Sequence, residues 1–122
     1  MIKLLIADDH PVIRNRIRQI LSDEKDMEVI CEASTGLEVL TLECTGTVDF
    51  LILDFNLTDM NAFELLPKLK AKYPNLPVVI LSAMSEGMFT NKLISMGASG
   101  FVSKETAAEE LALTIREILG VS

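Results

Sequence analysis

Short apolar runs typical of β-strands alternate five times along the chain with segments in which apolar residues recur at helical spacing. The predicted strands are residues Ile2–Ala7, Met27–Ser34, Asp49–Asp54, Pro77–Ser82 and Ser99–Ser103. Three of these runs are almost entirely apolar, including residues 50–53 and 78–81, which is typical of strands covered on both faces. The pattern therefore predicts a sheet that lies between two layers of helices.

The second predicted strand differs from the others because its apolar and polar residues alternate. Met27, Val29, Cys31 and Ala33 are expected on one side, with Glu28 and Glu32 on the other. Alternation of this kind is typical of a strand with one solvated face. We therefore expect this strand at an edge of the sheet.

The predicted helices carry recognisable start and stop signals. Pro11 opens the first helix, where a missing N–H costs nothing, and Gly97 is well placed to end the fourth. Pro67 is expected to kink the third helix or to confine its regular hydrogen bonding to one side. The core-facing positions of the first and fifth helices are expected to be Ile13, Ile17, Ile20, Leu21, Leu111, Ile115, Ile118 and Leu119.

Two further helix starts have the spacing of a capping box. Thr35 precedes Glu38, and Thr106 precedes Glu109, by three residues each. In a capping box the threonine hydroxyl and the acidic side chain satisfy backbone N–H groups at the helix start. The second and fifth helices are therefore expected to begin at these threonines.

This strict alternation of strands and helices predicts an α/β fold. The sheet is expected to be parallel, with right-handed crossovers and helices on both faces. The length of 122 residues suits one domain, residues 1–122. Ligands of such sheets bind beside the carboxyl ends of the strands, where the strand order reverses.

Composition narrows the function. The net charge of −7 repels nucleic acid, so direct DNA binding by this domain is not expected. The apolar runs are far shorter than the roughly 18 residues of a membrane span. Cys31 and Cys44 lack the spacing of a metal site and are expected to be two reduced thiols in a cytoplasmic protein.

Polar side chains stand at the carboxyl ends of four of the five predicted strands. Asp8 and Asp9 follow the first, Asp54 ends the third, Ser82 ends the fourth and Lys104 follows the fifth. If the first and third strands are neighbours, three carboxylates converge. Like charges at that range need a cation between them, and an all-oxygen cluster suits Mg²⁺.

The same edge has the chemistry of phosphoryl transfer. Lys104 can neutralise one phosphate oxygen, and the Ser82 hydroxyl can donate to another. A central carboxylate, Asp54, is then a plausible nucleophile that forms an acyl phosphate. An Asp-Asp pair alone is usually a turn or a cap, so the joint occurrence of these groups carries this interpretation.

The chain resembles, over its whole length, the receiver domain of two-component response regulators. The resemblance is carried by Ala7-Asp8-Asp9-His10-Pro11, Leu53-Asp54, Leu81-Ser82-Ala83 and the stretch of residues 96–104, which all fall in family order and spacing. Asp-Asp-His-Pro and Gly-Ala-x-Gly-Phe are most similar to receivers of the LuxR/NarL type. The resemblance implies a doubly wound, flavodoxin-like (βα)5 three-layer sandwich with a five-stranded parallel sheet of order 2-1-3-4-5.

The resemblance also implies a role for each site residue. Asp54 would be the phosphoacceptor, Asp9 a direct Mg²⁺ ligand, Asp8 a ligand through water and Asn56 a ligand through its backbone carbonyl. These roles join Ser82 as the hydroxyl that moves toward the phosphoryl group, Lys104 as the neutralising residue and Phe101 as the aromatic switch, whose alternative is a simple core position. Phosphorylation would switch the face made by the fourth helix and fifth strand.

The implied partners are a sensor histidine kinase and an effector, expected to be a helix-turn-helix DNA-binding domain. The chain is then expected to be the N-terminal part of a longer transcription regulator that forms a homodimer on phosphorylation, with a stand-alone receiver as the alternative. It would catalyse only its own phosphorylation and dephosphorylation, so it is not expected to be an enzyme in the ordinary sense. The donor histidine belongs to the kinase, which leaves His10 a supporting or packing role.

One loop departs from the family pattern. Thr58 stands where receivers commonly have Pro, and Asn61-Ala62 replaces Asp-Gly or a similar pair. Without Pro the loop is expected to be less pre-set. Ala62 tolerates a positive φ poorly, although Asn61 could adopt that conformation.

Three alternatives concern other residues and functions. A phosphorylation-independent, receiver-like interaction module would need none of the site chemistry. A haloacid-dehalogenase-type phosphatase is suggested by Asp54-Phe55-Asn56-Leu57-Thr58, but Asn56 cannot act as a general acid. The arginines of the first helix, Arg14, Arg16 and Arg18, are expected to form a solvated face, with a kinase-docking surface as the alternative.

Overall fold

The computed structural model describes residues 1–121, apart from the side chains of residues 84–86. The strands are β1 (Ile2–Ala7), β2 (Met27–Ala33), β3 (Phe50–Asp54), β4 (Val78–Ser82) and β5 (Gly100–Ser103). The α-helices are α1 (Pro11–Ser22), α2 (Gly36–Thr41), α3 (Ala62–Lys72), α4 (Thr90–Ser95) and α5 (Ala107–Leu119), and two 3-10 helices are η1 (Glu43–Gly46) and η2 (Met84–Phe89). The predicted strand boundaries agree with these to within one residue.

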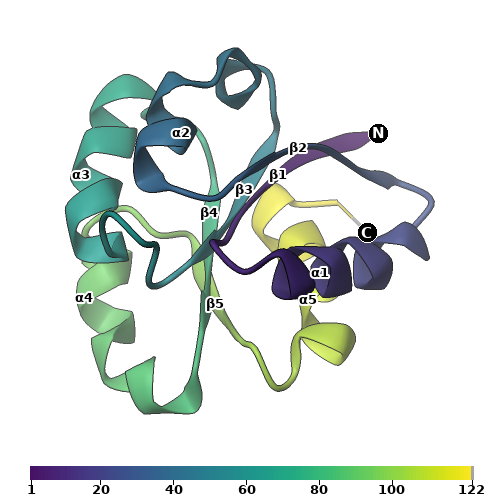
Figure 1. Cartoon of the computed structure of the whole chain (residues 1–122). Coiled ribbons are helices and arrows are strands. Elements are labelled where there is room, and N and C mark those ends of the chain that lie inside the picture. Colours follow the sequence, from purple (N-terminus) through teal and green to yellow (C-terminus); the bar gives the residue numbers. More distant parts are fainter. Residues whose placement is uncertain (122) are drawn as a thin grey trace.

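The five strands form one sheet of order β2-β1-β3-β4-β5, in which every neighbouring pair is parallel. Helices α1 and α5 cover one face, and α2, α3 and α4 cover the other (Figure 1). Residues 50–54 and 78–82 are all buried, as expected for strands enclosed on both sides. The predicted doubly wound three-layer fold and its strand order are confirmed.

Each face of the sheet has its own apolar core. Alternate residues of β1 divide between them: Leu4 and Ile6 pack with α1 and α5, whereas Leu5 packs with α2, α3 and α4. We call these the α1/α5 core and the α2–α4 core. Ile17, Leu21, Leu111 and Ile115, all predicted core positions, are buried in the α1/α5 core. Because apolar burial contributes about 25 cal/mol per Å², these two cores are the main stabilisation of the fold.

Strand β2 lies at the edge of the sheet, as predicted, but the predicted division of its faces is wrong. The register with β1 shifts by one residue, so that Leu4 pairs with Val29 and Leu5 with Cys31. This bulge at Ile30 reverses the side to which the following residues point. Met27 and Val29 therefore pack in the α1/α5 core, while Cys31 and Ala33 pack in the α2–α4 core.

The expectation of two reduced thiols is also wrong in this structure. Cys31 and Cys44 form a disulfide, with their Cα atoms 6.6 Å apart. Cys44 lies in η1, which packs against β2. The bulge in β2 explains the pairing, because it turns Cys31 toward the side on which η1 lies. A one-residue irregularity of this kind has no signature in the spacing of the two cysteines.

The two predicted capping boxes have different outcomes. The Thr35 hydroxyl accepts a hydrogen bond from the Glu38 N–H (3.1 Å), as predicted for the start of α2, whereas the Glu38 carboxylate accepts from the N–H of Ser34, one residue earlier (3.0 Å). Thr106 directly precedes α5, as predicted, but the predicted capping box there is wrong: Thr106 has φ −114° and ψ 10°, and its side chain makes no cap hydrogen bond in the described structure. Its hydroxyl instead donates to the Glu110 carboxylate, one helical turn later (3.0 Å).

Two predicted breaks in helices can be compared with the structure. Gly97 ends α4 with φ +115°, and its N–H donates to the Ile94 carbonyl (3.1 Å), which confirms its predicted place. Helix α3 runs through the exposed Pro67 from Ala62 to Lys72. Its regular span is therefore not confined to one side of the proline.

Candidate phosphoryl-transfer site

The sheet brings the predicted site residues to one edge. Asp54 is the last residue of β3, and Ser82 is the last residue of β4, which pairs with β3. Asp8 and Asp9 directly follow β1, on the other side of β3, and Lys104 directly follows β5. The strand order reverses between β1 and β3, so this edge is the crevice where doubly wound sheets bind ligands.

Three aspartates converge as the sequence predicts. Asp8 is fully buried and Asp54 is only 2% exposed, whereas the Asp9 side chain is 22% exposed. One ligand atom from each, together with one from His10, lies within 4.8 Å of the others. Carboxylates that are this close together and largely buried repel one another strongly unless a cation is present.

The hydrogen bonds of this cluster fit a divalent cation. Asp8 Oδ2 and Asp9 Oδ1 are buried and accept no hydrogen bond from the described groups of the chain, although the exposed His10 ring approaches Asp9 Oδ1 to 2.8 Å. A buried carboxylate oxygen without a partner is costly, and a hard ion such as Mg²⁺ is a ligand that relieves this cost. The donor set is therefore suitable for Mg²⁺ held through Asp8, Asp9 and Asp54.

Asp54 has the electrostatic environment of a reactive carboxylate. Burial raises its pKa to about 6; the hydrogen bond from Lys104 acts in the opposite direction, and the neighbouring Asp8 charge raises it further. Lys104 Nζ lies 2.9 Å from Asp54 Oδ1. The backbone of Asn56 also hydrogen-bonds the carboxylate, which favours its charged form. A perturbed carboxylate in a polar crevice is typical of functional sites.

Ser82 and Lys104 are tied together by the sheet. Ser82 pairs with Ser103 across β4 and β5, and the Lys104 N–H donates to the Ser82 carbonyl at 2.9 Å. The backbone thus fixes the base of the Lys104 side chain beside the end of β4. Phe101, the predicted switch, is partly exposed and packs against the α2–α4 core. This position is compatible with both of its predicted roles.

The loop after Asp54 is held by side chains in place of the common proline. Thr58 Oγ1 donates to Asp9 Oδ2 at 2.9 Å. Asp59 accepts from the N–H groups of Gly36 (2.8 Å) and Leu37 (3.0 Å) at the start of α2. A carboxylate at a helix N-terminus satisfies otherwise unpaired donors. The expectation of a less pre-set loop therefore overlooked these anchors.

The end of this loop forms a capping box that the sequence reading missed. The Asn61 side chain accepts from the Glu64 N–H (3.1 Å), and the Glu64 carboxylate accepts from the Asn61 N–H (3.3 Å). Asn61 has φ −100°, and no non-glycine residue in the described chain has a positive φ. The concern about a positive φ at Asn61-Ala62 is thus wrong. The Asn-x-x-Glu spacing was the available signal.

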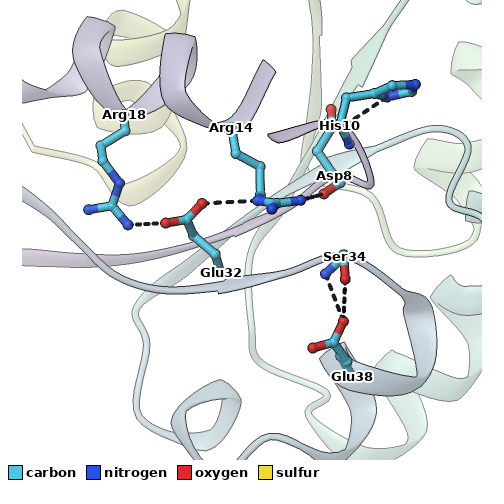
Figure 2. Close-up of polar contacts among 7 residues, drawn as sticks. All are labelled: Asp8, His10, Arg14, Arg18, Glu32, Ser34 and Glu38. Carbon is cyan, nitrogen blue, oxygen red and sulfur yellow. Dashed lines mark hydrogen bonds and ion pairs between the residues drawn. The ribbon is translucent and has the colours of Figure 1, made fainter. Parts of the chain in front are cut away.

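Helix α1 supports the acidic loop from the other side (Figure 2). Arg14 donates to the Asp8 carbonyl (2.5 Å) and to Glu32 (3.0 Å), and Arg18 also donates to Glu32. The hydrogen bond from Arg18, with that from Arg14, holds the pKa of Glu32 below its usual range. The prediction of a solvated face therefore fails for Arg14, which anchors the loop, while Arg16 is exposed.

His10 lies beside the acidic pair, and its side chain is 65% exposed. Its Nδ1 atom is 3.2 Å from Asp8 Oδ1 and 2.8 Å from Asp9 Oδ1. The backbone N–H of His10 also donates to Asp8 Oδ1 at 2.8 Å. These contacts are those of a residue that supports the carboxylates, as the sequence reading expected.

Within residues 1–121, no helix is both long enough and apolar enough to cross a membrane. The structure agrees in this respect with the short apolar runs of the sequence.

Comparison with known proteins identifies relatives of this chain. At 30% identity over 97% of its length, the chain is similar to the response regulator GacA of Pseudomonas aeruginosa and to the response regulator UvrY of Escherichia coli strain K12. It covers 55% and 54% of those two proteins, so it spans about half the length of these curated relatives.

Solved structures of LuxR-family response regulators are also similar to this chain. A LuxR-family DNA-binding response regulator from Staphylococcus aureus is similar with a TM-score of 0.83 and 27% identity, over 97% of this chain and 98% of that one. A LuxR-family response regulator from Aurantimonas sp. SI85-9A1 shares the fold at a TM-score of 0.88 and 24% identity, over 98% of this chain and 86% of that one. The predicted likeness to LuxR/NarL-type receivers is confirmed. The family model for the response regulator receiver domain matches residues 4–116, and the chain belongs to this family.

Proposed function

We propose that this receiver domain accepts a phosphoryl group on Asp54, with Mg²⁺ held by Asp8, Asp9 and Asp54. One observation above all supports the proposal: the buried Asp54 carboxylate contacts Lys104 and lies close to Asp8 and Asp9, each of which has a buried oxygen without a hydrogen bond among the described groups. A divalent cation would offset the negative charge of the three carboxylates, and Lys104 could then neutralise an oxygen of a phosphoryl group on Asp54. We propose that Asp9 binds the ion directly, Asp8 through water and Asn56 through its backbone carbonyl.

The transfer is a displacement at phosphorus. An Asp54 carboxylate oxygen forms the new bond to phosphorus, and the bond from phosphorus to the donor's leaving atom breaks. The electron pair of that bond stays with the leaving atom, an imidazole nitrogen if the donor is a phosphohistidine. Lys104 neutralises phosphoryl charge and Ser82 donates its hydroxyl. When bound, Mg²⁺ supplies further charge neutralisation. The domain acts only on itself, and water later hydrolyses the acyl phosphate.

The output would follow from a shift between two arrangements of the α4 and β5 face. Movement of Ser82 toward the phosphoryl group would leave space into which Phe101 turns. Phe101 is partly exposed on β5, next to the strand that ends in Ser82. Such a local change biases a two-state element and so carries a signal to a partner. A homodimer formed on phosphorylation is part of this proposal.

The biological setting is inferred from the relatives. We propose a sensor histidine kinase as the phosphodonor and a helix-turn-helix DNA-binding domain as the effector, with transcription as the output. The single domain of residues 1–122 would then be the N-terminal part of a longer regulator that works in the cytoplasm. The acidic receiver itself, with a net charge of −7, would not contact the nucleic acid.

Mass spectrometry tests the proposal. The chain is incubated with acetyl phosphate and Mg²⁺, and we expect a gain of about 80 Da, one phosphoryl group. Asp54→Asn should show no gain, while Asp23→Asn, an exposed acid after α1, should gain as the wild type does. Omission of Mg²⁺ should suppress the reaction. No gain with either acetyl phosphate or a kinase would favour the phosphorylation-independent interaction module.

A further inference from the structure

Thr58 makes a contact to the proposed metal site that the family pattern does not predict. Its hydroxyl, in the loop between β3 and α3, donates to Asp9 Oδ2 at 2.9 Å. Asp9 stands 49 residues earlier in the chain, so the bond joins two separate loops at the same sheet edge. A proline at this position has no hydroxyl and could not make it.

The two oxygens of Asp9 are thereby made different. Oδ2 has the Thr58 hydroxyl, whereas Oδ1 is buried and lacks a hydrogen-bond partner among the described groups. His10 Nδ1 lies 2.8 Å from Oδ1, on a side chain that is 65% exposed. Oδ1 is therefore the oxygen available to a cation, and the bond from Thr58 to Oδ2 need not break when a cation binds Oδ1.

The loop that carries Thr58 is fixed on both sides of it. The Leu57 N–H donates to the Met60 carbonyl (2.9 Å), and Leu57 is buried. Asp59 is held by its two hydrogen bonds to the start of α2. A hydroxyl presented from a tethered loop orients its acceptor better than one on a free loop, because less conformational entropy is lost in forming the bond.

We propose that Thr58 is a positioning residue that orients the Asp9 carboxylate so that Oδ1 faces a divalent cation. The proposal rests on the proposed metal site and deepens it. Groups that hydrogen-bond a metal ligand fix its orientation, and their loss typically weakens metal binding by about 10-fold to 100-fold. Thr58 is exposed, so the low end of that range, about tenfold, is expected.

The test measures cation affinity without phosphorylation. Free Mn²⁺ is counted by electron paramagnetic resonance during titration of the chain, and Mg²⁺ affinity follows from competition. Thr58→Val keeps the shape of the side chain and removes the hydroxyl, and we expect it to weaken both ions about tenfold. Thr58→Ser restores the donor and should lie within about twofold of the wild type. Urea unfolding of each variant checks that it is folded.

Two controls define the effect. Thr47→Val removes another exposed threonine hydroxyl, one that donates to the Cys44 carbonyl, and should leave cation affinity unchanged. Asp9→Asn should lose most of the binding if the measured site is the acidic one. Wild-type affinity in Thr58→Val, or equal weakening in Thr58→Ser, would overturn the role of Thr58 alone. Absence of binding by the wild type would overturn the metal site as well. Normal cation binding without phosphorylation would instead contradict only the proposed function.

Discussion

Lys104 Nζ lies 2.9 Å from Asp54 Oδ1, which places a cation from the loop after β5 against a buried carboxylate at the end of β3. Even so, the pKa of Asp54 is raised to about 6, because burial outweighs the lysine. The folded state therefore carries a free-energy cost when the buried Asp54 carboxyl is ionised. A bound cation or a phosphoryl group with its cation would relieve that cost, which is typical of sites built for a ligand.

The raised pKa of Asp54 predicts a dependence of stability on pH. Folding favours the protonated carboxyl, so Asp54 costs nothing below its ordinary pKa of 3.8 and its full penalty above about 6. The free energy of unfolding of the metal-free wild type should therefore fall, relative to Asp54→Asn, by about 2 kcal/mol as pH rises through this window. Urea unfolding from pH 4 to pH 7 measures the difference.

Saturating Mg²⁺ serves as the control for that prediction. It should reduce the difference between wild type and Asp54→Asn at pH 7, because it offsets the carboxylate charge. A difference that does not change with pH in the absence of metal would contradict the assigned penalty.

Gly97 should be far less replaceable than Gly87. Gly97 has φ +115°, and a Cβ there would lie 2.9 Å from Lys70 Cγ. Gly97→Ala should therefore lower the free energy of unfolding by about 1–2 kcal/mol. A Cβ on Gly87 would meet no described atom within 4 Å, so Gly87→Ala should change it by less than about 0.5 kcal/mol. Chemical denaturation compares them, and equal losses would contradict the backbone argument.

Thr35 and Thr106 each precede a glutamate by three residues, but they should contribute differently to the free energy of unfolding. Thr35→Ala removes a real N-cap and should cost about 1 kcal/mol of unfolding free energy. Thr106→Ala removes only an exposed hydrogen bond to Glu110 and should cost less than about 0.5 kcal/mol. Denaturant titration of both variants decides the point. A larger loss at Thr106 would mean that its hydroxyl caps α5 in solution.

The disulfide between Cys31 and Cys44 should be detectable and stabilising. Alkylation of the unfolded, unreduced chain should label neither sulfur, and reduction should make both reactive. The bridge restricts the unfolded chain, and its short loop limits the stabilisation that this gives. Its reduction should therefore lower the free energy of unfolding by about 2–3 kcal/mol. The bridge contains no residue of the acidic site, so Asp54 should still be phosphorylated after reduction. Alkylation of both sulfurs before reduction would contradict the bridge.

The sequence by itself determined the architecture and the composition of the candidate site. Apolar runs and helical spacing alternate strictly, and parallel strands bring their carboxyl ends to one edge, so Asp8, Asp54 and Lys104 could be placed together from their positions at strand ends alone. Local signals also worked where the partner is a few residues away, as for Thr35 and for Gly97.

The tertiary structure decided the contacts that depend on register and on distant loops. The bulge at Ile30 turns Cys31 toward Cys44, and the hydrophobic periodicity of the sequence does not predict such a one-residue shift in register. Thr58 meets Asp9 across 49 residues, and Arg14 reaches the Asp8 carbonyl only because α1 packs beside the site. The physical reason is the same in each case. Periodicity records which side of an element is apolar, whereas a hydrogen bond or a disulfide requires placement to within an ångström, which only the packed fold provides.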